Sequence, residues 1–177
     1  MTEILKIAQQ GDIILEQKAR FIDNIDDTKI QRLIDNLIET AKAKNGVGIA
    51  APQVSESYRL FIVASRSNQR YPDAPNMEPT AMINPRIIAH SSEIVKGWEG
   101  CLSVPNLRGF VPRYKAIEVE YYTRKGEIER VELSDFVARI FQHEYDHLDG
   151  ILFIDRVEDE SDLISEEEYQ KMLKNAV

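Results

Sequence analysis

Apolar residues at helical spacing mark the first strong element of the chain. They form one stripe made of Ile30, Leu33, Ile34, Leu37, Ile38 and Ala41. Asp26 or Asp27 can cap the start of this helix, and Asn45-Gly46 supplies a stop signal. The pattern therefore predicts a helix over about 28–44 with one face toward the core.

The next part of the chain alternates between loop and strand signals. Residues 46–53 are mostly small and predict a loop, whereas 58–64 are apolar enough for a buried strand. Residues 65–80 hold three prolines among polar residues and predict an exposed loop. Residues 81–88 then predict a short strand that Pro85 interrupts.

The second half begins with a hairpin signature. Apolar and polar residues alternate over 115–123 and again over 127–133, on either side of a turn with glycine. Ser134 then begins a predicted helix that reaches about Asp149, and a last helix is predicted over 165–175. Strands dominate the middle and helices flank them, which favours an α+β fold.

Length and composition limit the range of functions. A chain of 177 residues predicts one domain over 1–177, with residues 157–177 as an acidic linker and C-terminal helix. The net charge of −8 argues against a broadly basic surface for nucleic acids. Residues 155–168 carry eight acidic residues and one arginine, which predicts a solvated tail. No membrane-spanning run or signal peptide is evident. The single cysteine excludes an internal disulfide, so we expect a reducing cytoplasm.

The second long helix carries a charge in an unexpected place. At about 100° per residue, Glu144 projects into the middle of the apolar arc, and His143 and His147 lie at its edge. The opposite arc is polar and is expected to face water; it holds Asp135, Arg139, Gln142, Asp146 and Asp149. Burying an unpaired carboxylate costs several kcal/mol, so a compensating cation is expected. Two imidazoles at positions i and i+4 can hold a divalent metal.

A simpler explanation stays open for this helix: Glu144 pairs with a basic side chain, and the histidines are satisfied by hydrogen bonds. A catalytic metal also needs a third protein ligand, for which Cys101 is the candidate thiol. Taken alone, Cys101 is better explained as a small buried apolar residue, because free cysteines are usually packed in the core. A set of two histidines and one thiolate suits Fe(II), Zn(II), Ni(II) or Co(II), and does not suit Mg or Ca.

Three motifs together resemble the peptide deformylase family. They are GVGIAAPQ at 46–53, EGCLS at 99–103 and QHEYDHL at 142–148. The similarity extends from the first helix to about Arg156. It implies small mixed or antiparallel sheets packed around a central metal-binding helix, with N-terminal and C-terminal helices.

The resemblance also implies roles for residues that match the motifs. Cys101, His143 and His147 would bind the metal, and Glu144 would be the general acid/base. The Gln53 side chain and the Leu102 backbone N–H would bind the oxygen of the formyl group. Three sets of residues would meet the substrate, namely the backbones of Val47, Gly48 and Gly100, then Arg108, and then Phe136 and Ile140 around a methionine side chain. Asp135 departs from the family, which usually has glycine there; an acidic residue in a first helical turn is electrostatically favourable.

The reaction that this resemblance implies is removal of the formyl group from the N-terminal N-formylmethionine of new polypeptides, with release of formate. Water activated by the metal would be the nucleophile, with Fe(II) as the native ion and Zn, Ni or Co as substitutes. The partners would be formylated nascent peptides and, transiently, the ribosome, with no recognition of a nucleic-acid sequence and no membrane. The location would be the cytoplasm of a bacterial-type cell.

Three other functions compete with this one. A zinc endopeptidase or aminopeptidase also uses His-Glu-x-x-His, but the chain has no downstream ligand in a known pattern. A non-catalytic metal-binding or ribosome-associated module would need neither Glu144 nor Gln53. A structural domain would bind no metal at all.

Overall fold

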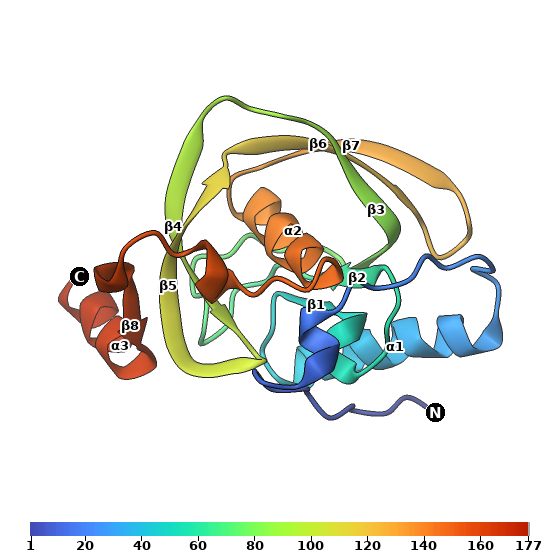
Figure 1. Ribbon diagram of the computed structural model, residues 1–177, viewed down its shortest axis with the longest axis horizontal. Helices are drawn as coiled ribbons and strands as arrows, with labels where there is room; N and C mark the ends of the chain where they lie inside the picture. The colour runs from blue at the N-terminus through green and yellow to red at the C-terminus, as the bar shows by residue number, and fades with distance from the viewer. Residues whose placement is uncertain (177) are drawn as a thin grey trace.

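The computed structural model describes residues 1–176, which form two antiparallel sheets and three α-helices (Figure 1). The five-stranded sheet has the order β1-β2-β3-β6-β7, and the three-stranded sheet has the order β4-β5-β8. The strands are β1 (Gly48–Ala50), β2 (Leu60–Val63), β3 (Thr80–His90), β4 (Ile94–Cys101), β5 (Val104–Tyr114), β6 (Ala116–Tyr122), β7 (Ile128–Ser134) and β8 (Leu163–Ser165). The helices are α1 (Thr28–Ala43), α2 (Asp135–Leu148) and α3 (Glu166–Asn175). The predicted α+β class is confirmed.

Helix α2 lies at the centre of the molecule and contacts strands of both sheets (Figure 1). Helices α1 and α3 lie on opposite sides of it. This arrangement agrees with the expectation of sheets packed around a central helix. It also means that water reaches little of α2, because strands cover it from more than one direction.

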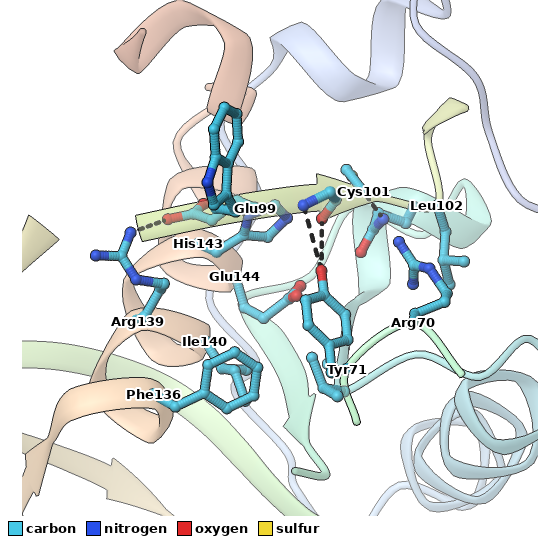
Figure 2. A pocket seen from close by; sticks show the side chains of 15 residues that line it. Arg70, Tyr71, Glu99, Cys101, Leu102, Phe136, Arg139, Ile140, His143 and Glu144 are labelled. Atoms are coloured by element: carbon cyan, nitrogen blue, oxygen red, sulfur yellow. Dashed lines mark hydrogen bonds and ion pairs between the residues drawn. The ribbon is translucent and has the colours of Figure 1, made fainter. Parts of the chain in front are cut away.

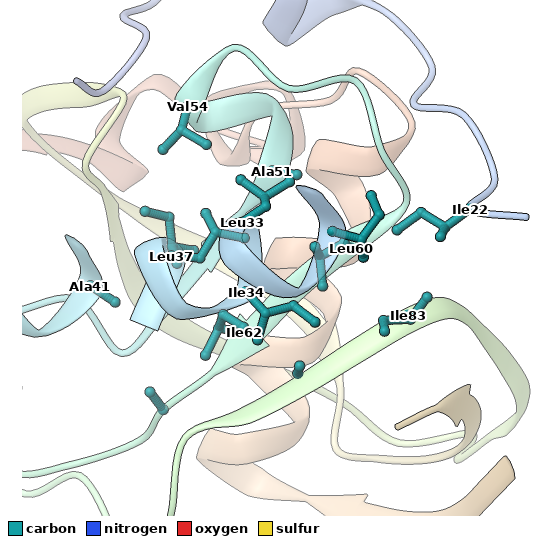
Figure 3. Close-up of a cluster of buried hydrophobic side chains, with 14 residues drawn as sticks. Ile22, Leu33, Ile34, Leu37, Ala41, Ala51, Val54, Leu60, Ile62 and Ile83 are labelled. Carbon is teal, nitrogen blue, oxygen red and sulfur yellow. The ribbon is translucent and has the colours of Figure 1, made fainter. Parts of the chain in front are cut away.

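Helix α1 forms where its apolar stripe predicts. The Asp27 side chain accepts a hydrogen bond from the Lys29 N–H at 2.8 Å, which caps the first turn. At the other end the Gly46 N–H donates to the Ala41 carbonyl at 2.9 Å. The buried stripe packs on β1 and β2, with Ile34 and Leu37 fully buried in the cluster that Figure 3 shows.

The structure differs from the predicted strands in three places. The predicted loop over 46–53 contains β1 and the start of a 3-10 helix (Ala51–Val54). Strand β3 continues through Pro85, because a register shift against β6 takes the proline out of the hydrogen-bonding pattern. Strands β4 and β5 were not predicted, since their glycines and prolines hide the alternation of apolar and polar residues.

The hairpin of β6 and β7 is confirmed, but the start of α2 differs from the prediction. Ser134 stands at the N-cap position, and its side chain makes no capping hydrogen bond. Asp135 has φ +53°, in the left-handed region that favours glycine. Glycine adopts this backbone conformation without strain, which explains why the family usually has glycine here. Asp135 adopts the same conformation at a cost in conformational energy.

The acidic C-terminal segment is docked, so the expectation of a solvated tail is wrong for part of it. Strand β8 pairs with β5, and α3 begins with a capping box between Ser165 and Glu168. Asp162 lies 2.8 Å from Lys96 on β4. None of the helices within residues 1–176 has the length and apolar character needed to cross a membrane.

Candidate active site

The site forms where the end of β4 meets the middle of α2 (Figure 2). Side chains of a strand alternate between its two faces, so Gly97, Glu99 and Cys101 share the face toward α2. A Cβ on Gly97 would lie 2.7 Å from the Arg139 guanidinium carbon, which confirms how closely this face approaches the helix. The strand thus brings a carboxylate and a thiol to the helix that carries the histidines.

The candidate metal ligands come together as predicted. The ligand atoms of Cys101, His143 and His147 all lie within 4.8 Å of one another, and all three residues are buried. The Cys101 Sγ is 3.4 Å from the His147 Nε2. Burial lowers the pKa of His147 well below its usual value, and the positive charges of His143 and Arg113 act in the same direction. A neutral imidazole is the form that binds metals, so the donor set fits a borderline-soft divalent cation.

Glu144 is buried beside this set without a partner. Only 4% of the residue is exposed, and its Oε2 accepts no hydrogen bond in the part of the chain that the structure describes. Burial raises the pKa of Glu144 to about 7, although the charge of His143 opposes the rise. The alternative in which Glu144 pairs with a basic side chain is therefore not realised. An orphaned carboxylate oxygen needs a cation or a water within the site.

His143 is oriented by Glu99, which the sequence did not single out. The His143 Nδ1 lies 2.8 Å from the Glu99 Oε1. A carboxylate only accepts, so Nδ1 is the nitrogen that donates here, and Nε2 is the ring nitrogen left for a metal. Burial works against the charge on Glu99, but Arg113 and His143 hold its pKa well below the usual range. Its position two residues before Cys101 on a strand was the signal that could have found it.

Two arginines complete a buried network around Glu99. Arg113 donates from Nε and Nη2 to the two carboxylate oxygens, each at 2.9 Å, and Arg139 donates to Oε2 at 2.8 Å. Arg113 also reaches Asp146 at 2.6 Å. The expectation that Arg139, Gln142 and Asp146 face water is wrong: each is less than a tenth exposed. The β4–β5 sheet covers this middle part of the polar arc with matching charges, whereas Asp135 at the start of the helix is exposed as predicted.

Gln53 is held in a single orientation. Its Oε1 accepts from the Ala50 N–H at 2.9 Å, which fixes the NH₂ group on the other side. That group donates to the Ser103 Oγ at 3.1 Å and lies 3.5 Å from the Cys101 Sγ. The amide donor is therefore aimed at the residues around the thiol, as its predicted role requires.

Nearly all of the predicted site residues line one pocket. His147 lies deeper, at 1% exposure, and Arg108 lies elsewhere. The pocket also includes five residues to which the sequence analysis gave no role in the site, namely Arg70, Tyr71, Trp98, Glu99 and Arg139. Gly48 is required by space, because a Cβ there would lie 2.7 Å from the Glu144 Oε1. Strands β1 and β4 are the outer strands of their sheets, so each presents an unpaired backbone edge.

Arg108 is not brought into the pocket. Its side chain is fully buried and donates to the Glu166 carboxylate at 2.6 and 3.2 Å. Its guanidinium lies between two aromatic rings, 4.9 Å from Tyr71 and 4.4 Å from Tyr169. Helix α3 therefore holds this arginine from the far side of the β4–β5 sheet.

Fold and site together define a class of protein. A thiol from a strand end joins two histidines of one helix, with a buried, unpartnered glutamate between them and an oriented amide nearby. This combination is that of a metal-dependent hydrolase.

The comparisons with known proteins identify the particular family. The chain matches the sequence profile of the polypeptide deformylase family over residues 4–162, and it belongs to that family. It is 65% identical to "Peptide deformylase 2" of Nostoc sp. over 171 residues, which cover 97% of this chain and 96% of the relative. It is also 47% identical over 152 residues to "Peptide deformylase 2" of Shewanella oneidensis, covering 86% and 83% of the two chains.

Solved structures agree with this assignment. The class I type b peptide deformylase from Acinetobacter baumannii, in its Met-Ala-Ser-bound crystal structure, superposes with a TM-score of 0.86 at 46% identity. The match covers 89% of this chain and all of that one. A peptide deformylase from Thermotoga maritima gives a TM-score of 0.79 at 36% identity, covering 89% of this chain and 99% of that one. The chain is therefore a metal-dependent enzyme that removes the N-formyl group from nascent peptides, which sets aside the peptidase and non-catalytic alternatives.

Proposed function

We propose that Cys101, His143 and His147 hold one divalent metal ion, with Fe(II) as the native ion and Zn, Ni or Co as substitutes. The observation that carries this proposal is the mutual distance of at most 4.8 Å between the three ligand atoms in a buried position. One thiolate with two imidazoles suits these ions better than it suits hard cations. When bound, such a cation supplies Lewis acidity and brings the pKa of water close to neutrality.

Glu144 acts as the general base and then the general acid of the hydrolysis. It takes a proton from the attacking water, whose oxygen bonds to the formyl carbon, and gives it to the amine as the C–N bond breaks. The products are formate and a free N-terminal methionine. The support for this role is the burial of Glu144 next to His143 and the oxygen that lacks a hydrogen-bond partner.

Gln53 and Leu102 stabilise the formyl oxygen as it gains negative charge. The Gln53 NH₂ group is fixed by the Ala50 contact, and Leu102 follows Cys101 in the pocket lining. Loss of one such donor costs about 2.7–4 kcal/mol of transition-state stabilisation. A donor that is already held in place needs no reorganisation during the reaction.

The substrate is an extended N-formylmethionyl peptide. We assign its backbone to Val47 and Gly48 on one side and Gly100 on the other, since the edges of β1 and β4 can accept an added strand. Phe136 and Ile140 line the pocket and would surround the methionine side chain. The related A. baumannii protein has Met-Ala-Ser bound. We do not extend a substrate contact to Arg108, whose guanidinium is buried against Glu166.

The setting of the reaction follows from its substrate. Formylated chains emerge during protein synthesis, so we propose that the enzyme works in the cytoplasm and meets the ribosome transiently. Residues 1–177 would act as one catalytic domain.

Formate release from formyl-Met-Ala-Ser, combined with anaerobic elemental analysis, tests these roles. Glu144→Gln is expected to lose almost all turnover while its metal content stays equal to that of the parent. Cys101→Ser is expected to lose most of the metal, because a hydroxyl is a poor ligand for these ions. Glu118→Gln removes a half-buried carboxylate that pairs with the exposed Arg130 far from the site, and it serves as the matched control.

Two results would contradict the proposal. Near-normal turnover of Glu144→Gln would remove its acid/base role, and unchanged metal content in Cys101→Ser would place the third ligand elsewhere. Activity that survives prolonged aeration would argue against Fe(II), because the ion and its thiolate both oxidise.

A further inference from the structure

The hydroxyl of Tyr71 forms hydrogen bonds with the backbone of Gly100. It accepts a hydrogen bond from the Gly100 N–H at 3.2 Å and lies 3.4 Å from the Gly100 carbonyl oxygen, to which it can donate (Figure 2). Strand β4 is an outer strand, and β5 pairs with Glu99 and Cys101 on either side of Gly100. The tyrosine thus satisfies the peptide groups that would otherwise receive an added strand.

The Tyr71 ring also closes the space in front of these groups. Its centroid is 5.4 Å from that of Phe136, one of the residues around the predicted methionine pocket. Tyr71 belongs to the loop between β2 and β3 and lines the pocket together with Gly100 and Phe136.

Tyr71 is held in this place by neighbours outside the pocket. The buried Arg108 guanidinium lies 4.9 Å from its ring, and Arg108 Nη2 lies 3.4 Å from the Arg70 carbonyl oxygen. The Tyr71 N–H donates to the Asn68 side chain at 3.1 Å. Glu166 of α3 pairs with Arg108 in turn, so the tyrosine is supported by a side chain that α3 contacts.

We infer that Tyr71 is a specificity-determining residue that competes with the substrate backbone for Gly100 and so lowers the preference for formylated chains with backbone beyond the methionine. The inference rests on the proposed pairing of Gly100 with substrate. One Gly100 N–H cannot serve both Tyr71 and a peptide, so binding must break the tyrosine contact. A peptide with downstream backbone binds Gly100 only after breaking the Tyr71 contact, whereas formylmethionine alone offers no such backbone and leaves the contact in place. The longer substrate therefore bears a cost that the short one does not.

Tyr71→Phe tests this inference because it removes the hydroxyl and keeps the ring against Phe136 and Arg108. The measurement is kcat/KM for formate release from formyl-Met-Ala-Ser and from N-formylmethioninamide, each with the metal-loaded enzyme. The ratio of the value for formyl-Met-Ala-Ser to that for N-formylmethioninamide is expected to rise about tenfold in the variant, which corresponds to about 1.4 kcal/mol. The rise should come from a lower KM for formyl-Met-Ala-Ser with its kcat unchanged. Tyr58→Phe, a tyrosine that packs on Arg20 and Lys29, is the matched control.

The outcomes separate this inference from the proposed function. An unchanged ratio in Tyr71→Phe, with wild-type activity intact, would overturn the inference and leave the proposed function standing. The same rise in Tyr58→Phe would also overturn it, because the effect would not belong to the Gly100 contact. Absence of formate release by the wild-type enzyme would overturn the proposed function and this inference together.

Discussion

The two faces of the β4–β5 sheet each bury an arginine of β5, but the two arginines meet different surroundings. On the face toward α2, Arg113 pairs with Glu99 and Asp146, and all of these side chains are less than a tenth exposed. On the other face, Arg108 pairs with Glu166, whose side chain is 35% exposed. Arg113 belongs to a closed network beneath the candidate metal ligands. Arg108 pairs with Glu166 of the docked helix α3 instead.

The comparison shows how one strand can carry a rigid side-chain network on one face and a more adjustable ion pair on the other. A buried network that is fully satisfied fixes its members, so Glu99 can hold the His143 ring in one orientation. A pair with one partner in contact with water is weaker and exchanges more easily. We therefore expect changes on the α2 face to threaten folding, and changes on the α3 face to act on the support of Tyr71.

The largest effect is expected for Glu99→Gln. The change leaves Arg113 and Arg139 buried with less compensating charge, which costs about 3–5 kcal/mol in the free energy of unfolding. Urea unfolding of the variant and its parent measures this cost. Glu120→Gln removes a carboxylate whose partner Arg86 is 65% exposed, and as a control it should cost less than about 1 kcal/mol. Equal losses of unfolding free energy in the two variants would contradict the distinction between the buried network and a surface ion pair.

A smaller effect is expected for Glu166→Gln on the other face. The variant removes the carboxylate that pairs with the buried Arg108, and we expect a loss of about 1–3 kcal/mol in the free energy of unfolding. The neighbouring Glu167→Gln removes an exposed partner of Lys171 and should change stability by less than about 0.5 kcal/mol. If Glu166→Gln behaved like Glu167→Gln, α3 would not anchor Arg108.

The charge on Glu166 also gives a pH dependence. Burial alone would raise its pKa, but hydrogen bonds from Arg108 and Gln170 hold the pKa below its usual value. A carboxyl with a depressed folded-state pKa stabilises the protein fully above the unfolded value of about 4.3, and this contribution is lost as pH falls through the folded-state pKa. The stability gap between the parent and Glu166→Gln should therefore be constant near neutrality and shrink below about pH 4. Unfolding curves over this range would show a constant gap if the pair were unimportant.

The smallest effect is expected outside both faces, at the turn that leads into α2. Asp135 has φ +53°, so Asp135→Gly should raise the free energy of unfolding by about 0.5–1 kcal/mol. Asp135→Ala keeps the strained conformation and should give no such gain. Thermal unfolding of the three proteins decides this, and a gain in the alanine variant would point to the lost charge instead.

The sequence predicted the elements whose side chains repeat regularly. The stripe from Ile30 to Ala41 predicted α1, and the alternation on either side of Gly126 predicted the hairpin, because each pattern is local. Strands β4 and β5 were not predicted, because glycines close to Arg139 and Arg108 replace the side chains that would have shown the alternation. The catalytic motif was visible because Glu144 conflicts with the apolar arc around it.

What the sequence determined by itself is the chemistry: two imidazoles one helical turn apart, a glutamate between them and a single thiol. Whether the thiol reaches the imidazoles was decided only by the tertiary structure, which brings the Cys101 Sγ at the end of β4 to within 3.4 Å of the His147 Nε2 on α2. The same holds for the polar arc of α2 and for Tyr71 against Gly100. Local periodicity reports on the nearest turn or strand of the chain. A contact between distant segments depends on how two sheets close around one helix, and no local pattern encodes that.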